Sequence, residues 1–136
     1  MPRILVVDDE AHVRAMISIV LRVHHFEIVE AANAAAALKA IIEGASFDAA
    51  IVDIFLEGTN GFDLITMMRE RTPELAVVAI SGMAALDFVS QWPELADVVC
   101  LQKPFRPNGL MGAIETARKA VGQSTAGDGV GEGVAF

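Results

Sequence analysis

The chain has 136 residues, of which 54% are hydrophobic, and its formal net charge is −8. This length predicts one domain with a sizeable core. The acidic balance argues against a nucleic-acid partner and against binding to an anionic membrane. The short N-terminal apolar run ends in acids, unlike a signal peptide, and no apolar stretch is long enough to cross a bilayer. We therefore expect a cytoplasmic protein with no membrane partner.

Short apolar runs recur along the chain and predict buried strands. They are nearly continuous rather than alternating, which is typical of parallel strands that are covered on both faces. The runs occupy residues 4–7, 26–29, 49–52, 75–80 and 98–101.

The segments between these runs carry apolar residues at helical spacing. They predict helices over residues 13–21, 34–42, 62–68, 84–91 and 107–120. Asn33 is a plausible N-cap of the second helix and Gly44 its end. Pro93 stops the fourth helix, and Pro107 suits the first turn of the fifth.

The alternation of strand and helix predicts an α/β doubly wound sheet of five parallel strands with five helices on both faces. We place this domain at residues 1–120. The segment after it is Gly-rich and aperiodic, and we expect residues 121–136 to form a flexible C-terminal tail.

Polar residues stand at the carboxyl ends of four of the predicted strands. The acidic residues 8–10 follow the first strand, Asp53 ends the third, Ser81 ends the fourth and Lys103 ends the fifth. Ligands bind outside these ends in open α/β sheets, where the winding reverses. We therefore expect these residues to form one site.

The residue types in this site favour phosphoryl transfer. Neighbouring carboxylates raise one another's pKa, and a Mg²⁺ ion resolves that conflict because it prefers carboxylate oxygens and water. An aspartate carboxylate can attack phosphorus, and the transfer otherwise needs positive charge and in-line positioning. Mg²⁺ and Lys103 can supply that charge, and the Ser81 hydroxyl can donate to a phosphoryl oxygen.

On these residues the chain resembles the receiver domains of two-component response regulators. The resemblance covers about residues 2–120 and rests on Asp8-Asp9, Asp53, Gly61, Ser81 and Lys103-Pro104-Phe105 in order. It implies a flavodoxin-like sheet of order 2-1-3-4-5 and a stand-alone protein similar to the chemotaxis regulators.

The resemblance also implies a role for each metal-binding residue. Asp9 would be a direct Mg²⁺ ligand, and Asp8 would bind directly or through water. Asp53 would be both a ligand and the phospho-acceptor. The backbone carbonyl of Phe55 would complete the metal site.

The remaining roles concern the phosphoryl group. Ser81 would be the switch hydroxyl that moves to meet the phosphate, and Lys103 would pair with it. The Lys103-Pro104 bond would be cis. The donor would be a sensor histidine kinase or a histidine phosphotransfer protein. The output would be phosphorylation-dependent binding to an unidentified protein, with the chain a monomer or a weak phosphorylation-dependent dimer. Beyond its own phosphorylation and dephosphorylation, no enzyme activity is implied.

Two departures from the family pattern keep a second hypothesis open. Cys100 stands where an aromatic residue is usual, and Glu57 stands where proline is usual and makes the 57–60 loop less rigid or more charged. The alternative is a receiver fold that serves as a scaffold with a weakened switch. A Mg²⁺-dependent phosphohydrolase that uses an aspartyl nucleophile is disfavoured, because Phe55 occupies the position of its usual second acid.

Single residues also have structural interpretations. Asp9 could be a helix N-cap and Ser81 a turn residue. Trp92 is either an interaction residue or a cap on the core. Four other aspartates are interpreted as caps or solvated surface, namely Asp48, Asp63, Asp87 and Asp97.

Overall fold

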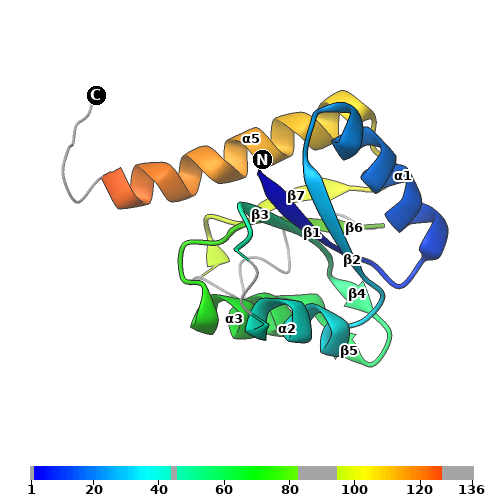
Figure 1. Ribbon diagram of the computed structural model, residues 1–136, viewed down its shortest axis with the longest axis horizontal. Helices are drawn as coiled ribbons and strands as arrows, with labels where there is room; N and C mark the ends of the chain where they lie inside the picture. The colour runs from blue at the N-terminus through cyan, green and yellow to red at the C-terminus, as the bar shows by residue number, and fades with distance from the viewer. Residues whose placement is uncertain (1, 44–45, 83–94, 127–136) are drawn as a thin grey trace.

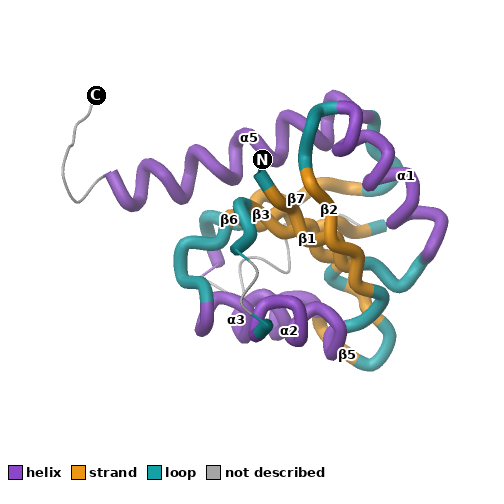
Figure 2. Tube along the Cα trace, in the orientation of Figure 1, coloured by secondary structure: helices purple, strands orange, loops and turns teal. Residues whose placement is uncertain are grey.

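The computed structural model describes residues 2–43, 46–82 and 95–126. Its elements are shown in Figure 1 and, coloured by type, in Figure 2. In chain order they are β1 (Arg3–Val7), α1 (Ala11–Val23), β2 (Glu27–Ala31), α2 (Ala34–Ile42), β3 (Ala49–Asp53), β4 (Phe55–Leu56), β5 (Thr59–Asn60), α3 (Gly61–Arg71), β6 (Ala76–Ser81), β7 (Val99–Gln102) and α5 (Pro107–Ala126).

The main sheet has five parallel strands in the order β2-β1-β3-β6-β7. With β6 and β7 as the fourth and fifth strands, this is the predicted order 2-1-3-4-5. Asp53 pairs with Ile80, and Ser81 pairs with Gln102, so the carboxyl ends of β3, β6 and β7 lie level. The register brings the predicted site residues to one edge of the sheet.

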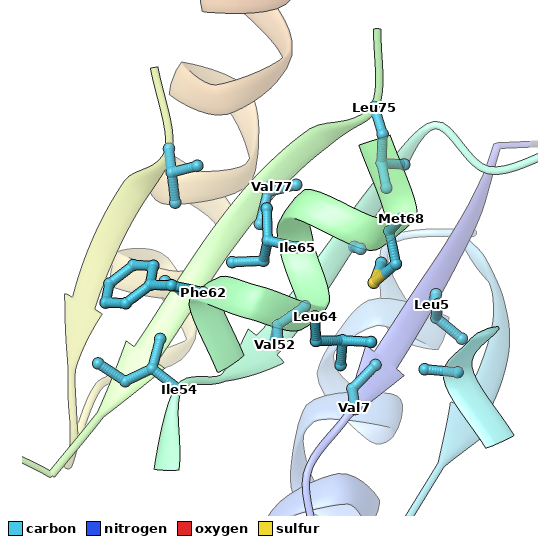
Figure 3. Packing of buried hydrophobic residues seen from close by; sticks show 14 of the residues in the cluster. Leu5, Val7, Val52, Ile54, Phe62, Leu64, Ile65, Met68, Leu75 and Val77 are labelled. Atoms are coloured by element: carbon cyan, nitrogen blue, oxygen red, sulfur yellow. The ribbon is translucent and has the colours of Figure 1, made fainter. Parts of the chain in front are cut away.

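Helices cover both faces of this sheet (Figure 1). Ile17 of α1 and Ile114 of α5 pack against one face, in a cluster with Ile4 and Ile51. Helices α2 and α3 cover the other face. Figure 3 shows how residues of α3 lie over the strands there, including Phe62, Leu64, Ile65 and Met68 against Leu5, Val7, Val52 and Val77.

The helix ends follow local chemistry. The Asn33 side chain accepts a hydrogen bond from Ala36 N at 2.8 Å, as expected for the N-cap of α2, and α5 begins at Pro107. Helix α5 continues to Ala126 rather than ending near Ala120, because no strong helix breaker intervenes and a single glycine costs only about 1 kcal/mol. Gly44, the predicted fourth helix, Trp92 and residues 127–136 lie outside the described residues. None of the described helices is both long and apolar enough to span a bilayer.

The predicted 57–60 loop is part of a hairpin that spans residues 55–60. Strands β4 and β5 pair antiparallel, and Glu57-Gly58 form the two-residue connection. Gly58 has a φ of 78° at the second central position of the turn, a left-handed conformation that glycine adopts without strain. The hairpin ends at Asn60, whose side chain accepts from Phe62 N at 2.7 Å and caps α3.

Gly61 brings the start of α3 against the residues after Asp53. A Cβ at this position would lie 2.3 Å from Ile54 Cα and 2.7 Å from the Asp53 carbonyl oxygen. Only glycine permits this approach. The hairpin and Gly61 together fix the chain that follows the candidate phospho-acceptor.

Candidate functional site

An acidic pocket opens at the carboxyl edge of the sheet. Asp8 follows β1, Asp53 ends β3, Ser81 ends β6 and Lys103 follows β7. The pocket is lined by Asp9, Glu10, Asp53, Phe55, Gly82 and Lys103. The structure therefore gathers the predicted residues at one place, as the strand-end argument expected.

Lys103 is the centre of charge in this pocket. Its Nζ lies 3.1 Å from Asp8 Oδ2, 3.1 Å from Glu10 Oε1 and 3.1 Å from Asp53 Oδ2. Burial disfavours the charged amine, but hydrogen bonds to the three carboxylates outweigh that effect and raise the pKa of Lys103 above its ordinary value. The ammonium is therefore held in its charged form.

Asp8 is the most buried of these acids, with 0% of its surface exposed. Its Oδ1 accepts a hydrogen bond from Glu10 N at 2.8 Å. Its Oδ2 forms no hydrogen bond of good geometry among the described residues, and its contact is the ion pair with Lys103. Burial is the main reason that the pKa of Asp8 is raised, and hydrogen bonds to Glu10 N and Lys103 oppose it.

The two carboxylate oxygens of Asp53 have different partners. Oδ1 accepts from Phe55 N at 2.9 Å, and Oδ2 accepts from Lys103 Nζ at 3.1 Å. The side chain is only 6% exposed. One oxygen is thereby fixed to the backbone, while the other faces the cation, so the carboxylate is held in one orientation.

Asp9 and Glu10 both line the pocket, and they differ in their contacts. Asp8, Glu10 and Asp53 each offer an oxygen within 4.8 Å of the others. Asp9 lines the same pocket but is exposed, and its Oδ2 accepts from Glu57 N at 3.2 Å. The N-cap residue of α1 is Glu10 rather than Asp9. Sequence reasoning gave no role to Glu10, although the Asp-Asp-Glu run was its signal.

Arg14 is a second residue that sequence reasoning missed. Its Nη1 donates to the Asp8 carbonyl oxygen at 2.6 Å, and its Nε lies 3.4 Å from Glu30 Oε1. Glu30 Oε2 in turn accepts from the buried Ser18 hydroxyl at 3.0 Å. This chain of contacts ties the loop after β1 to α1 and β2. Because these residues are not neighbours in the sequence, no local motif predicts their contacts.

Ser81 and Lys103 are joined by a backbone hydrogen bond at the carboxyl edge of the sheet. Ser81 is fully buried at the end of β6, and its carbonyl oxygen accepts from Lys103 N at 2.6 Å. The Lys103-Pro104 peptide bond is cis, as the resemblance implied.

Cys100 and Glu57, the two residues that differ from the family pattern expected from the sequence, lie in different surroundings. Cys100 on β7 is half-buried against the core on the α2–α3 face, and burial raises the pKa of its thiol. It is a small core residue, as predicted. Glu57 is exposed in the hairpin turn, and its backbone N–H binds Asp9.

The pocket suits a Mg²⁺ ion in its donor chemistry. Mg²⁺ takes oxygen ligands from one or two carboxylates and keeps several waters. Asp8, Glu10 and Asp53 supply convergent carboxylate oxygens, and the buried Asp8 Oδ2 lacks a well-formed hydrogen bond among the described residues. These residues fit the ion.

A comparison with models of protein families identifies the family of this chain. The family model described as "Response regulator receiver domain" matches residues 4–115. The chain belongs to this family. Receiver domains act as signalling switches.

Individual curated proteins share a modest sequence identity with this chain. The chain is 30% identical to the phosphate regulon transcriptional regulatory protein PhoB of Pseudomonas aeruginosa over 121 residues, which are 88% of this chain and 52% of PhoB. It spans about half the length, or less, of the first curated relatives that it matches.

Solved receiver structures share the fold. A receiver domain protein from Clostridium thermocellum has a TM-score of 0.79 and 28% identity, covering 88% of this chain and 95% of that one. The response regulator TrrA of Thermotoga maritima, in complex with Mg(2+)-BeF, has a TM-score of 0.76 and 26% identity, covering 86% of this chain and 99% of that one.

Proposed function

We propose that this receiver accepts a phosphoryl group on Asp53 in a Mg²⁺-dependent reaction and signals by binding another protein in the phosphorylated state. The observation that carries the proposal is the orientation of Asp53. One of its oxygens is held by Phe55 N, and the other lies 3.1 Å from the Lys103 ammonium. A carboxylate fixed in this way beside a cation is suited to attack phosphorus.

The donor in this proposal is a phosphohistidine of a sensor histidine kinase or a histidine phosphotransfer protein. A bond forms between an Asp53 carboxylate oxygen and phosphorus, and the P–N bond to the donor imidazole breaks. The electron pair leaves on the imidazole nitrogen, and a proton that the other ring nitrogen carries, or that water supplies, makes the departing imidazole neutral. Lys103 neutralises charge on the phosphoryl oxygens as they approach Asp53.

Asp8, Asp9, Asp53 and the Phe55 carbonyl would hold the Mg²⁺ ion, and Glu10 would stay an outer carboxylate paired with Lys103. The bound ion supplies positive charge to the transferring phosphoryl group. The TrrA complex supports the proposal, because a response regulator with a similar fold binds Mg(2+)-BeF.

Signalling requires that a partner has different affinities for two states of the receiver. We propose that Ser81 and Lys103 are drawn to the phosphoryl group and that the loops after β3 and β6 change most, since Cys100 has no ring to rotate. The part of this change beyond Gly82 lies outside the described residues. The net charge of −8 favours a protein over a nucleic acid as the partner of this chain's surface. The stand-alone and oligomeric states stay predictions.

The test is incubation with acetyl phosphate, with and without Mg²⁺, followed by intact mass measurement. We expect a gain of one phosphoryl group that needs Mg²⁺ and is abolished in Asp53→Asn. Asp63→Asn is the matched control, because Asp63 is an exposed aspartate in the first turn of α3. A normal yield in Asp53→Asn would exclude Asp53 as the acceptor.

The scaffold hypothesis remains the alternative because Cys100 lacks the ring of the usual switch residue. It predicts a partner that binds equally well with and without beryllofluoride and Mg²⁺. A partner that binds several-fold more tightly with them supports the switch.

A further inference from the structure

Glu10 makes an ion pair that its position in the chain does not explain. It is the N-cap residue of α1, yet its side chain forms no capping hydrogen bond. The carboxylate instead reaches Lys103, 93 residues further along the chain. A capping side chain normally accepts a hydrogen bond from the backbone at the helix start, and the Glu10 carboxylate contacts a distant lysine instead.

The pocket gives Lys103 more acceptors than it can keep after phosphorylation. An ammonium group has three N–H donors. Hydrogen bonds to Glu10 and Asp53 use two of them, and Asp8 Oδ2 lies 3.1 Å from the same nitrogen as an ion-pair partner. A phosphoryl oxygen on Asp53 that approaches Lys103 therefore competes with these carboxylates for its donors.

Exposure decides which carboxylate yields. Asp8 is fully buried, and Asp53 is nearly so and carries the phosphoryl group itself. The Glu10 side chain is 50% exposed. Moving Glu10 into water restores its hydration and leaves no buried charge behind, whereas moving Asp8 would require the surrounding structure to open.

We infer that Glu10 is a displaceable third partner of Lys103 that slows phosphorylation by anionic donors. It occupies the donor that the incoming phosphoryl oxygen needs, and its charge repels the donor at the pocket entrance. Glu10 acts through Lys103 and is a positioning residue rather than a catalytic one. The inference rests on the proposed function and adds a residue that tunes its rate.

The test compares Glu10→Gln with the wild-type chain under saturating Mg²⁺, with the Mg²⁺ requirement of each chain titrated separately. Acetyl phosphate is a dianion at neutral pH and phosphoramidate a monoanion. We expect Glu10→Gln to react with acetyl phosphate about two- to fivefold faster, the range of one partly exposed ion pair. The gain with phosphoramidate should be smaller. A purely structural role would not depend on the charge of the donor.

Two further variants separate the cause. Glu57→Gln removes the same charge from the exposed hairpin turn beside the pocket, and its rate should stay at the wild-type value. Glu10→Asp keeps the charge but is one methylene shorter, so it should release Lys103 and fall between wild type and Glu10→Gln. Far-UV circular dichroism checks that each variant is folded.

The outcomes distinguish the two proposals. If the wild-type chain takes phosphate but Glu10→Gln is no faster, the Glu10 inference fails alone. The same holds if Glu57→Gln accelerates the reaction equally, or if Glu10→Asp stays at the wild-type rate. A wild-type chain that takes no phosphate overturns the proposed function, and the Glu10 inference with it.

Discussion

Arg69 and Lys103 are both paired with carboxylates, but the number of carboxylates around each cation differs. Arg69 of α3 meets one carboxylate, with Nη1 2.7 Å from Asp97 Oδ1 and Nη2 2.7 Å from Asp97 Oδ2. Its Nε and Nη2 also donate to the Leu75 carbonyl oxygen, at 3.2 and 2.9 Å. Lys103 instead faces three carboxylates at the edge of the sheet.

This difference indicates that the Arg69–Asp97 pair stabilises the fold and that the Lys103 cluster is suited to chemistry. The Arg69–Asp97 pair is balanced in charge, bidentate and rigid, so it stabilises the join between α3 and the segment before β7. The Lys103 pocket has an excess of negative charge, which opposes folding and attracts cations. Asp97, which the sequence suggested was a cap or solvated, is thus a structural partner.

The largest expected effect is on the rate of phosphorylation and comes from removing Lys103 from among its three carboxylates. Lys103→Ala should lower the rate of phosphorylation by acetyl phosphate by about 10²- to 10³-fold, because it removes the protein's own positive charge from the reacting oxygens. Intact mass measured over time gives the rate. Lys119→Ala, an exposed lysine on α5, should react normally. A Lys103→Ala rate within threefold of wild type would contradict this role.

Breaking the balanced pair should damage the fold and spare the chemistry. Arg69→Ala should lower the free energy of unfolding by about 2–3 kcal/mol, because it removes a bidentate pair and the donors to Leu75 O from a side chain that is 14% exposed. Urea denaturation measures the loss. Arg69→Lys keeps the charge but loses the fork and should recover only part of it.

Phosphorylation per folded molecule should be unchanged in Arg69→Ala. A lower rate at full folding would show that the Arg69–Asp97 pair is coupled to the pocket.

Removing one acid from the pocket should stabilise the protein. Asp8→Asn should raise the free energy of unfolding by about 1 kcal/mol in Mg²⁺-free buffer at neutral pH, because a buried charge that repels Asp53 is lost. The pKa of Asp8 is raised in the folded state, so its ionisation opposes folding above that pKa and ceases to do so as acid protonates both states.

The gain from Asp8→Asn should therefore shrink as the pH falls toward the ordinary carboxyl range. Thermal unfolding followed over a pH series measures it. A gain that is constant with pH would point to packing rather than charge.

The smallest expected loss of stability comes from breaking an ion pair that is exposed to solvent. Glu115 and Lys119 form an (i, i+4) pair at 3.1 Å on α5, with side chains 70% and 68% exposed. Lys119→Ala should lower the free energy of unfolding by only about 0.3–0.5 kcal/mol. Added salt should reduce that loss in urea titrations. A loss near that of Arg69→Ala would mean that exposure does not separate the two pairs.

Local patterns predicted the features that depend on neighbouring residues. The apolar runs located the five strands, and the caps at Asn33 and Pro107 located two helix starts. Asp53, Ser81 and Lys103 were placed at one edge because parallel strands bring their carboxyl ends together. Those inferences need only periodicity and the handedness of the fold.

The contacts that sequence reasoning missed join residues distant in the chain. Arg69 and Asp97 are 28 residues apart, and Glu10 and Lys103 are 93 apart. A side chain's partner across such a separation depends on packing that no short motif encodes. The β4–β5 hairpin was missed for another reason, because each of its strands has only two residues and is too short to show a strand pattern.

The 93-residue separation between Glu10 and Lys103 also bears on how the site comes into being. The acids at residues 8–10 are synthesised long before Lys103, and until β7 docks beside β6 they face one another without their lysine. The charge cluster is therefore complete only when β7 is paired beside β6. Acceptance of a phosphoryl group would then report, molecule by molecule, that folding has finished.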